Sequence, residues 1–70
     1  MKISARNKLA GKVIRITEGS VNTEVVIELA PGIEITSIIT KTSAEELEIK
    51  VGRKVYAVVK ASNVLVGVDH

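Results

Sequence analysis

The chain contains no cysteine and a single histidine, His70, although it is only 70 residues long. A domain of this size buries roughly 60% of the surface that its unfolded chain exposes. Ordering each residue costs on the order of 1.5 kcal/mol, which offsets most of what so small a core contributes. Disulfide bonds and thiolate metal sites are excluded, and one terminal histidine gives no basis for a histidine site. We therefore expect one domain, residues 1–70, that is stable only as an oligomer.

Hydrophobic and polar residues alternate with a period of two in several short runs. In residues 23–29, for example, Val25 and Ile27 alternate with Glu24 and Glu28. Turn-forming residues, such as Pro31 and Gly32, separate the runs. Many short strands with frequent turns are typical of a small barrel or sandwich. The expected strands are residues 12–16, 23–29, 33–40, 54–60 and 63–68.

One helical signal interrupts this pattern. Ser43 with Glu46 three residues later fits a capping box, which predicts a helix that Ser43 caps and Gly52 closes. Such a helix has one or two turns and needs packing to be stable. The combination predicts an all-β fold, a small five-stranded OB-like barrel with one short helix between the third and fourth strands.

The sequence shows no targeting signal. Residues 1–4 open no apolar signal-peptide core. No apolar run approaches the roughly 20 residues that span a bilayer. We expect a soluble, cytoplasmic protein with no membrane partner.

The residue types also disfavour two classes of function. A catalytic nucleophile needs a base beside it, and His70 is terminal, so we expect no enzyme activity. Barrels of this kind bind single-stranded nucleic acid by stacking bases on aromatic side chains. Tyr56 is the only aromatic residue, so a nucleic-acid-binding barrel is the weaker alternative. We expect Tyr56 in the barrel wall or at a subunit interface.

An anion site has better support, because donors gather at three places and the net charge is +2. Two hydrogen-bond donors lie two residues apart near the amino terminus, and two more lie at a strand end. The remaining two lie at the start of the short helix, where the helix dipole favours anions. Each has an ordinary explanation as a cap or a solvated charge, so a structural oligomer with incidental anion binding remains an alternative. These donors are Ser4 and Arg6, Thr40 and Ser43, and Lys60 and Ser62.

Three segments carry a family resemblance. They are Ile-Ser-Ala-Arg-Asn at residues 3–7, Gly-Ser-Val-Asn at 19–22 and Val-Val-Lys-Ala-Ser-Asn-Val at 58–64. In this order they resemble the molbindin (Mop) family over nearly the whole chain. The resemblance implies a domain that binds molybdate or tungstate at subunit interfaces of a homohexamer, a trimer of dimers. It implies storage and intracellular buffering of the oxyanion, with no organic cofactor, no metal bound directly by side chains and no nucleic acid.

The resemblance also implies the site residues. Thr42 adjoins Ser43, so either hydroxyl could cap the helix while the other binds the anion. A second type of site, near a threefold axis, would involve Gly19, Ser20, Val21 and Asn22. The main site would consist of Ser4, Arg6, Thr40, Ser43, Lys60 and Ala61.

Overall fold

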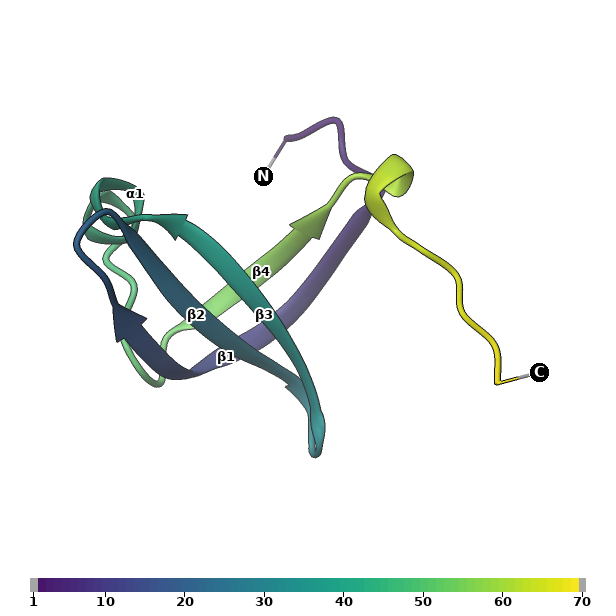
Figure 1. Cartoon of the computed structure of the whole chain (residues 1–70), viewed down its shortest axis with the longest axis horizontal. Coiled ribbons are helices and arrows are strands. Elements are labelled where there is room, and N and C mark those ends of the chain that lie inside the picture. Colours follow the sequence, from purple (N-terminus) through teal and green to yellow (C-terminus); the bar gives the residue numbers. More distant parts are fainter. Residues whose placement is uncertain (1, 70) are drawn as a thin grey trace.

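The fold was analysed in a computed structural model that describes residues 2–69, so the expectation about His70 lies outside the described residues. One antiparallel sheet contains four strands in the order β3-β2-β1-β4. A short helix, α1, joins β3 to β4, and a 3-10 turn, η1, follows β4 (Figure 1). A mostly β chain with one short helix between its third and fourth strands is thus confirmed. The elements are β1 (Asn7–Glu18), β2 (Asn22–Ala30), β3 (Ile33–Thr40), α1 (Lys41–Glu46), β4 (Lys54–Val59) and η1 (Ala61–Asn63).

The long first strand curls the sheet. Its first half pairs with β4 and its second half with β2, from Asn7 opposite Val59 to Glu18 opposite Thr23. The register with β2 shifts between Val13 and Arg15. A bulge of this kind bends the strand and increases its twist. The result is a half-barrel, with β3 and β4 as its two edges (Figure 1).

The concave side of the curled sheet holds a small core. Val13, Val25, Ile27 and Ala57 are buried there, and Val13 is completely inaccessible. The alternate residues Val25 and Ile27 of β2, and Ile35 and Ile39 of β3, pack in this cluster as predicted. The alternation fails at Val26, which is also buried but lies outside the cluster. Half-buried residues surround it: Ile16, Leu29, Ile35, Ile39, Ile49 and Val55.

Gly11 allows β1 to pass close to β2. A Cβ atom at this position would lie 2.6 Å from Ile27 Cγ2 and 2.7 Å from the Glu28 carbonyl oxygen. Both distances are shorter than real Cβ contacts, so a side chain here would push the strands apart. The curl of the half-barrel therefore depends on a glycine at this position.

The prediction that Ser43 caps the helix is wrong. Thr40 is the N-cap residue, in extended conformation, and its Oγ1 accepts a hydrogen bond from the Ser43 N–H at 3.0 Å. The helix begins three residues earlier than the capping-box pattern indicated, because β3 runs directly into it. At the other end Glu48 has φ 54° and the Ile49 N–H donates to the Ala44 carbonyl oxygen at 3.0 Å. This Schellman-type ending directs Ile49 onto the core.

The predicted fifth strand is also wrong for the single chain. Residues 64–68 follow η1 in extended conformation but pair with no strand of the described chain. The turn η1 directs them away from the sheet, so no strand edge lies beside them (Figure 1). Leu65 and Val66 are each 91% exposed. The chain forms a four-stranded half-barrel, not a closed five-stranded barrel.

Candidate functional site

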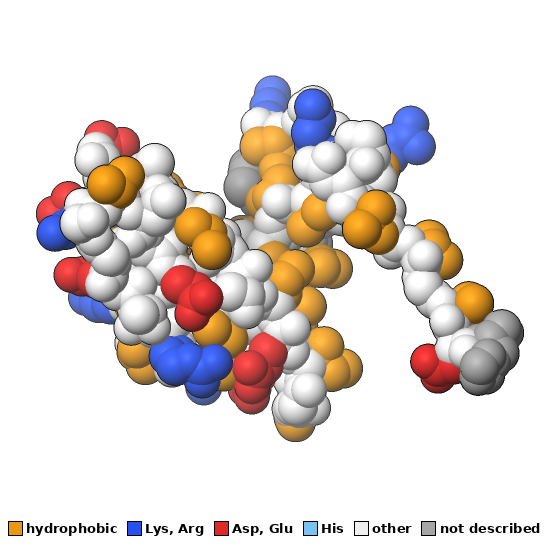
Figure 2. Space-filling view, in the orientation of Figure 1, with side chains coloured by type: hydrophobic (Ala, Val, Ile, Leu, Met, Phe, Trp, Pro, Cys, Tyr) orange, Lys and Arg blue, Asp and Glu red, His pale blue; other side chains and the backbone are white. Residues whose placement is uncertain are grey.

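One group of predicted site residues lies where β1 begins and β4 ends. Asn7 pairs with Val59, so the residues next to them, Arg6 and Lys60, lie at the same end of the sheet. Both are exposed. Figure 2 shows that the charged side chains around this end of the visible face are basic. We call Ser4, Arg6, Lys60 and Ala61 the terminal donor group.

The second group is the start of α1. The Thr40 hydroxyl donates to Ser43 Oγ at 2.8 Å and accepts from the Ser43 N–H at 3.0 Å. This arrangement uses the Thr40 hydroxyl as the cap and leaves the proton of the Ser43 hydroxyl able to turn toward a ligand. The sequence left open whether the Thr42 or the Ser43 hydroxyl caps the helix. In the structure neither of them does. We call Thr40 and Ser43 the helix-start pair.

The predicted second site lies against the helix-start pair. Asn22 pairs with Thr40, and the Lys41 N–H donates to the Val21 carbonyl oxygen at 2.8 Å. Gly19 closes the turn by donating its N–H to the Asn22 carbonyl oxygen at 2.8 Å. The turn at residues 19–22 and the start of α1 thus form one end of the molecule.

The structure does not bring the six main-site residues together in one chain. The helix-start pair lies at the α1 end and the terminal donor group at the η1 end, and these ends are at opposite sides of the sheet (Figure 1). Four of the six residues are neighbours, and the other two are remote from them. A ligand that contacts all six would have to lie between two chains.

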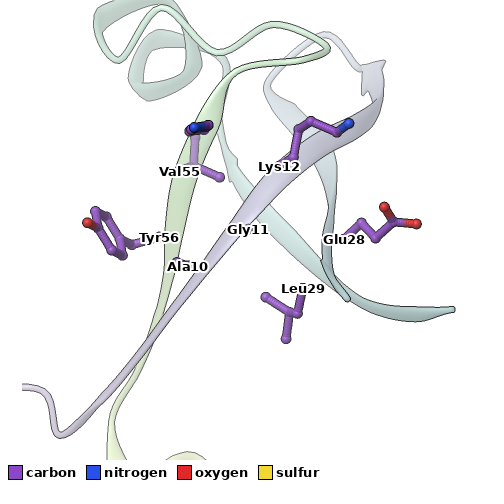
Figure 3. A pocket seen from close by; sticks show the side chains of 8 residues that line it. Ala10, Gly11, Lys12, Glu28, Leu29, Val55 and Tyr56 are labelled. Carbon is purple, nitrogen blue, oxygen red and sulfur yellow. The ribbon is translucent and has the colours of Figure 1, made fainter. Parts of the chain in front are cut away.

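A cavity of about 460 Å³ contains none of the predicted site residues. It lies beside Gly11, with Glu28 and Tyr56 on its walls (Figure 3). Sequence reasoning missed it, because it results from the curl of the sheet at Gly11. Its lining carries charges of both signs, from Lys12, Glu28 and Lys54.

Tyr56 is exposed on β4, where Lys8 Nζ lies 5.8 Å from the centroid of its ring. This is a cation–π distance, and one ring gives no platform on which successive bases could stack. Within residues 2–69 no three His, Cys, Asp or Glu side chains are grouped so that they could hold a metal ion. Nor does this part of the chain include a helix with the length and hydropathy to cross a membrane.

Comparison with known proteins identifies the family to which this chain belongs. The family described as the TOBE domain matches residues 3–66. Molybdenum-pterin-binding protein 2 of Clostridium pasteurianum is 52% identical over 66 residues, which cover 94% of this chain and 97% of that protein. The chain therefore belongs to the TOBE-domain family and, within it, to the molbindin (Mop) proteins.

Solved structures agree with this assignment. MopII from Clostridium pasteurianum superposes with a TM-score of 0.89 at 49% identity, covering 96% of this chain and 100% of that one. A molybdate-binding protein from Sporomusa ovata gives 0.88 at 41% identity, covering 94% and 97%. The cytoplasmic molybdate-binding protein ModG, with molybdate bound, gives 0.87 at 49% identity, covering 93% of this chain and 46% of that one.

Proposed function

We propose that this protein binds molybdate or tungstate and serves to store and buffer the oxyanion in the cytoplasm, without catalysing a reaction. Support comes from the similar proteins, whose names specify molybdate or molybdenum-pterin binding and, for ModG, a cytoplasmic location. The chain acts as a single domain, residues 1–70. The free oxyanion is the ligand, and no organic cofactor takes part.

The observation that carries the proposal is the separation of the donors. The helix-start pair and the terminal donor group lie at opposite ends of one chain (Figure 1). The helix-start pair offers hydroxyls, and the terminal donor group offers a hydroxyl, two cationic side chains and backbone. Two copies placed end to end bring the complementary groups together, so the oxyanion binds at the interface between them. The assembly is a hexamer, a trimer of dimers, and the turn at residues 19–22 forms a second type of site near its threefold axis.

The chemistry of the ligand matches these groups. Molybdate is a tetrahedral dianion at neutral pH and only accepts hydrogen bonds, so its site should offer donors alone. Arg6 and Lys60 supply charge-assisted hydrogen bonds, which are about twice as strong as neutral ones. The Ser43 hydroxyl, whose proton is not used by the cap, supplies a third donor. Sulfate carries the same charge, so selection against it depends on the size of the cavity.

Thermal unfolding tests the proposal. A ligand that binds only the native assembly stabilises it by RT ln(1 + [L]/Kd), about 2.7 kcal/mol at a concentration of 100 Kd. We expect molybdate and tungstate to raise the unfolding midpoint markedly and sulfate at equal concentration to raise it much less. Equal shifts with all three anions would indicate general ionic stabilisation and contradict a selective site. Native mass spectrometry with an oligonucleotide is the control for the nucleic-acid alternative.

A further inference from the structure

A cavity of about 110 Å³ lies between α1, the end of β1 and the start of β2 (Figure 1). Ile16, Ala44 and Ile49 form its apolar lining. None of the predicted oxyanion-site residues lines this cavity, so it is distinct from both predicted sites. Its polar lining consists of Glu18, Thr23, Lys41, Glu45 and Glu48.

The hydroxyl of Thr23 is the unusual group in this lining. Thr23 is only 1% exposed, and its Oγ1 has no hydrogen-bond partner among the described residues. Buried polar groups are nearly always hydrogen-bonded, because an unpaired one destabilises the folded state. Valine suits the same strand position and avoids that cost. The hydroxyl therefore points to a polar species in the cavity that it lines.

The charge of the lining specifies the sign of this species. Glu18, Glu45 and Glu48 contribute three carboxylates and Lys41 one ammonium group, so the net charge is −2. All four side chains are exposed, so the charged groups are reached from the solvent. Figure 2 shows acidic side chains around α1. A divalent cation neutralises such a lining, whereas an anion is repelled by it.

The end of α1 brings one of these carboxylates to the cavity. Glu48 has φ 54°, in the left-handed region where a helix usually ends on glycine or asparagine. Its N–H donates to the Glu45 carbonyl oxygen at 3.0 Å. The tight ending thus places Glu45 and Glu48 on the wall of the same cavity as Thr23.

We propose that this cavity binds a hydrated divalent cation of the Mg²⁺ type. Among residues 2–69 no three acidic side chains are grouped closely enough to hold an ion by themselves. Mg²⁺ suits this arrangement, because it dehydrates reluctantly and is usually bound through one or two carboxylates and several waters. The cavity accommodates about three waters of its shell, at roughly 30 Å³ each. One of them donates a hydrogen bond to Thr23 Oγ1, and the carboxylates contact the ion or its other waters.

The cation also acts on the proposed oxyanion site. Ala44 lines the cavity, and Ser43 of the helix-start pair precedes it in α1. Glu45 and Glu48 carry charge of the same sign as molybdate, so a cation that neutralises them favours binding of the dianion. Such coupling is reciprocal, so molybdate should raise the affinity for the cation by the same factor. This consequence rests on the proposed function, whereas the cation site itself does not.

Mn²⁺ locates the cation directly, because it is paramagnetic and prefers the same oxygen ligands as Mg²⁺. In the full-length wild-type protein without oxyanion, substoichiometric MnCl₂ should selectively broaden the amide signals of Glu18, Thr23 and residues 44–48. Excess MgCl₂ should restore these signals. Electron paramagnetic resonance of the same samples measures the affinity for Mn²⁺.

Thr23→Val is the decisive variant, because it removes the hydroxyl and retains the β-branched shape. We expect it to keep at least the wild-type unfolding midpoint without cation and to bind Mn²⁺ about threefold more weakly or worse, the loss of one neutral hydrogen bond. Glu48→Gln should weaken binding about tenfold, because a charge-assisted interaction is lost. Glu34→Gln is the matched control, because Glu34 is exposed on β3 and does not line the cavity, so it should keep the wild-type affinity.

Three results would overturn the cation site: Mn²⁺ broadening without preference for the residues around the cavity, wild-type Mn²⁺ affinity in Thr23→Val, or equal losses in Glu34→Gln and Glu48→Gln. The first would show that water alone partners the Thr23 hydroxyl. Molybdate titration of the same wild-type sample, with and without MgCl₂, separates this proposal from the proposed function. Molybdate binding without selective broadening refutes the cation site alone, and selective broadening without molybdate binding refutes the function alone.

Discussion

Thr40 has two roles, because it caps α1 and belongs to the helix-start pair, and unfolding measured without oxyanion reports on the cap alone. Its Oγ1 accepts the Ser43 N–H at 3.0 Å and donates to Ser43 Oγ at 2.8 Å. Thr40→Ala removes the cap and leaves the Ser43 N–H without its acceptor. The helix has only six residues, so losing one of its few hydrogen bonds matters.

The expected cost follows from this geometry. Loss of an N-cap hydroxyl destabilises a protein by about 1 kcal/mol, and Thr40 is exposed, so water replaces part of the lost bond. For a domain of 60–100 residues, 1 kcal/mol corresponds to a fall of roughly 4–8 °C in the unfolding midpoint. The measurement is thermal unfolding by circular dichroism at fixed protomer concentration, without oxyanion.

Thr40→Ser is the matched control, because serine caps helices at least as well as threonine. We expect it to keep the wild-type midpoint. Ser43→Ala keeps the backbone donor to Thr40 and should change the midpoint little while weakening oxyanion binding. An unchanged midpoint in Thr40→Ala, or an equal fall in Thr40→Ser, would refute the assignment of Thr40 as the cap.

Four further substitutions test other parts of the molecule. Gly11→Ala should cost about 1–3 kcal/mol in denaturant unfolding, because its Cβ would lie 2.6 Å from Ile27 Cγ2; a wild-type value would show that the strands separate without strain. Tyr56→Ala should lower stability or assembly and retain anion specificity; full stability with lost binding would place Tyr56 in the site. Arg6→Ala and Lys60→Ala should each weaken molybdate binding about tenfold or more in isothermal titration of folded, assembled protein, because a charge-assisted bond contributes roughly 1.5–3 kcal/mol; wild-type affinity in both would refute the terminal donor group.

The regular parts of the fold were predictable from local patterns. The alternation in β2 and β3 identified the side that faces the core, and Val25 and Ile27 are buried there. The beginning of β1 was not predicted, because Lys8, Leu9 and Ala10 lack β-branched residues and become a strand only by pairing with β4. Pairing partners remote in sequence outweigh weak local preference at such positions.

The candidate site was predictable as a set of residue types but not as an arrangement. The donors stand out in the sequence, but the distance between Ser43 and Lys60 depends on the curl of the sheet. The helix cap was misassigned because Ser43 and Glu46 fit a capping box, while Thr40 lay within a predicted strand. The strand at residues 63–68 was predicted from residue type alone, and it is wrong because η1 directs this segment away from the four-stranded sheet.

Complementation between two defective chains tests the central claim, a site shared by two copies, most directly. One chain carries Thr40→Ala and Ser43→Ala, and the other carries Arg6→Ala and Lys60→Ala. Alone, each assembles without a complete site, so neither should bind molybdate in isothermal titration. Refolded together in equal amounts, random pairing in a symmetric assembly should restore about a quarter of the sites with wild-type affinity. No restored binding in mixed oligomers of confirmed composition, or wild-type binding by either chain alone, would contradict a site built from two chains.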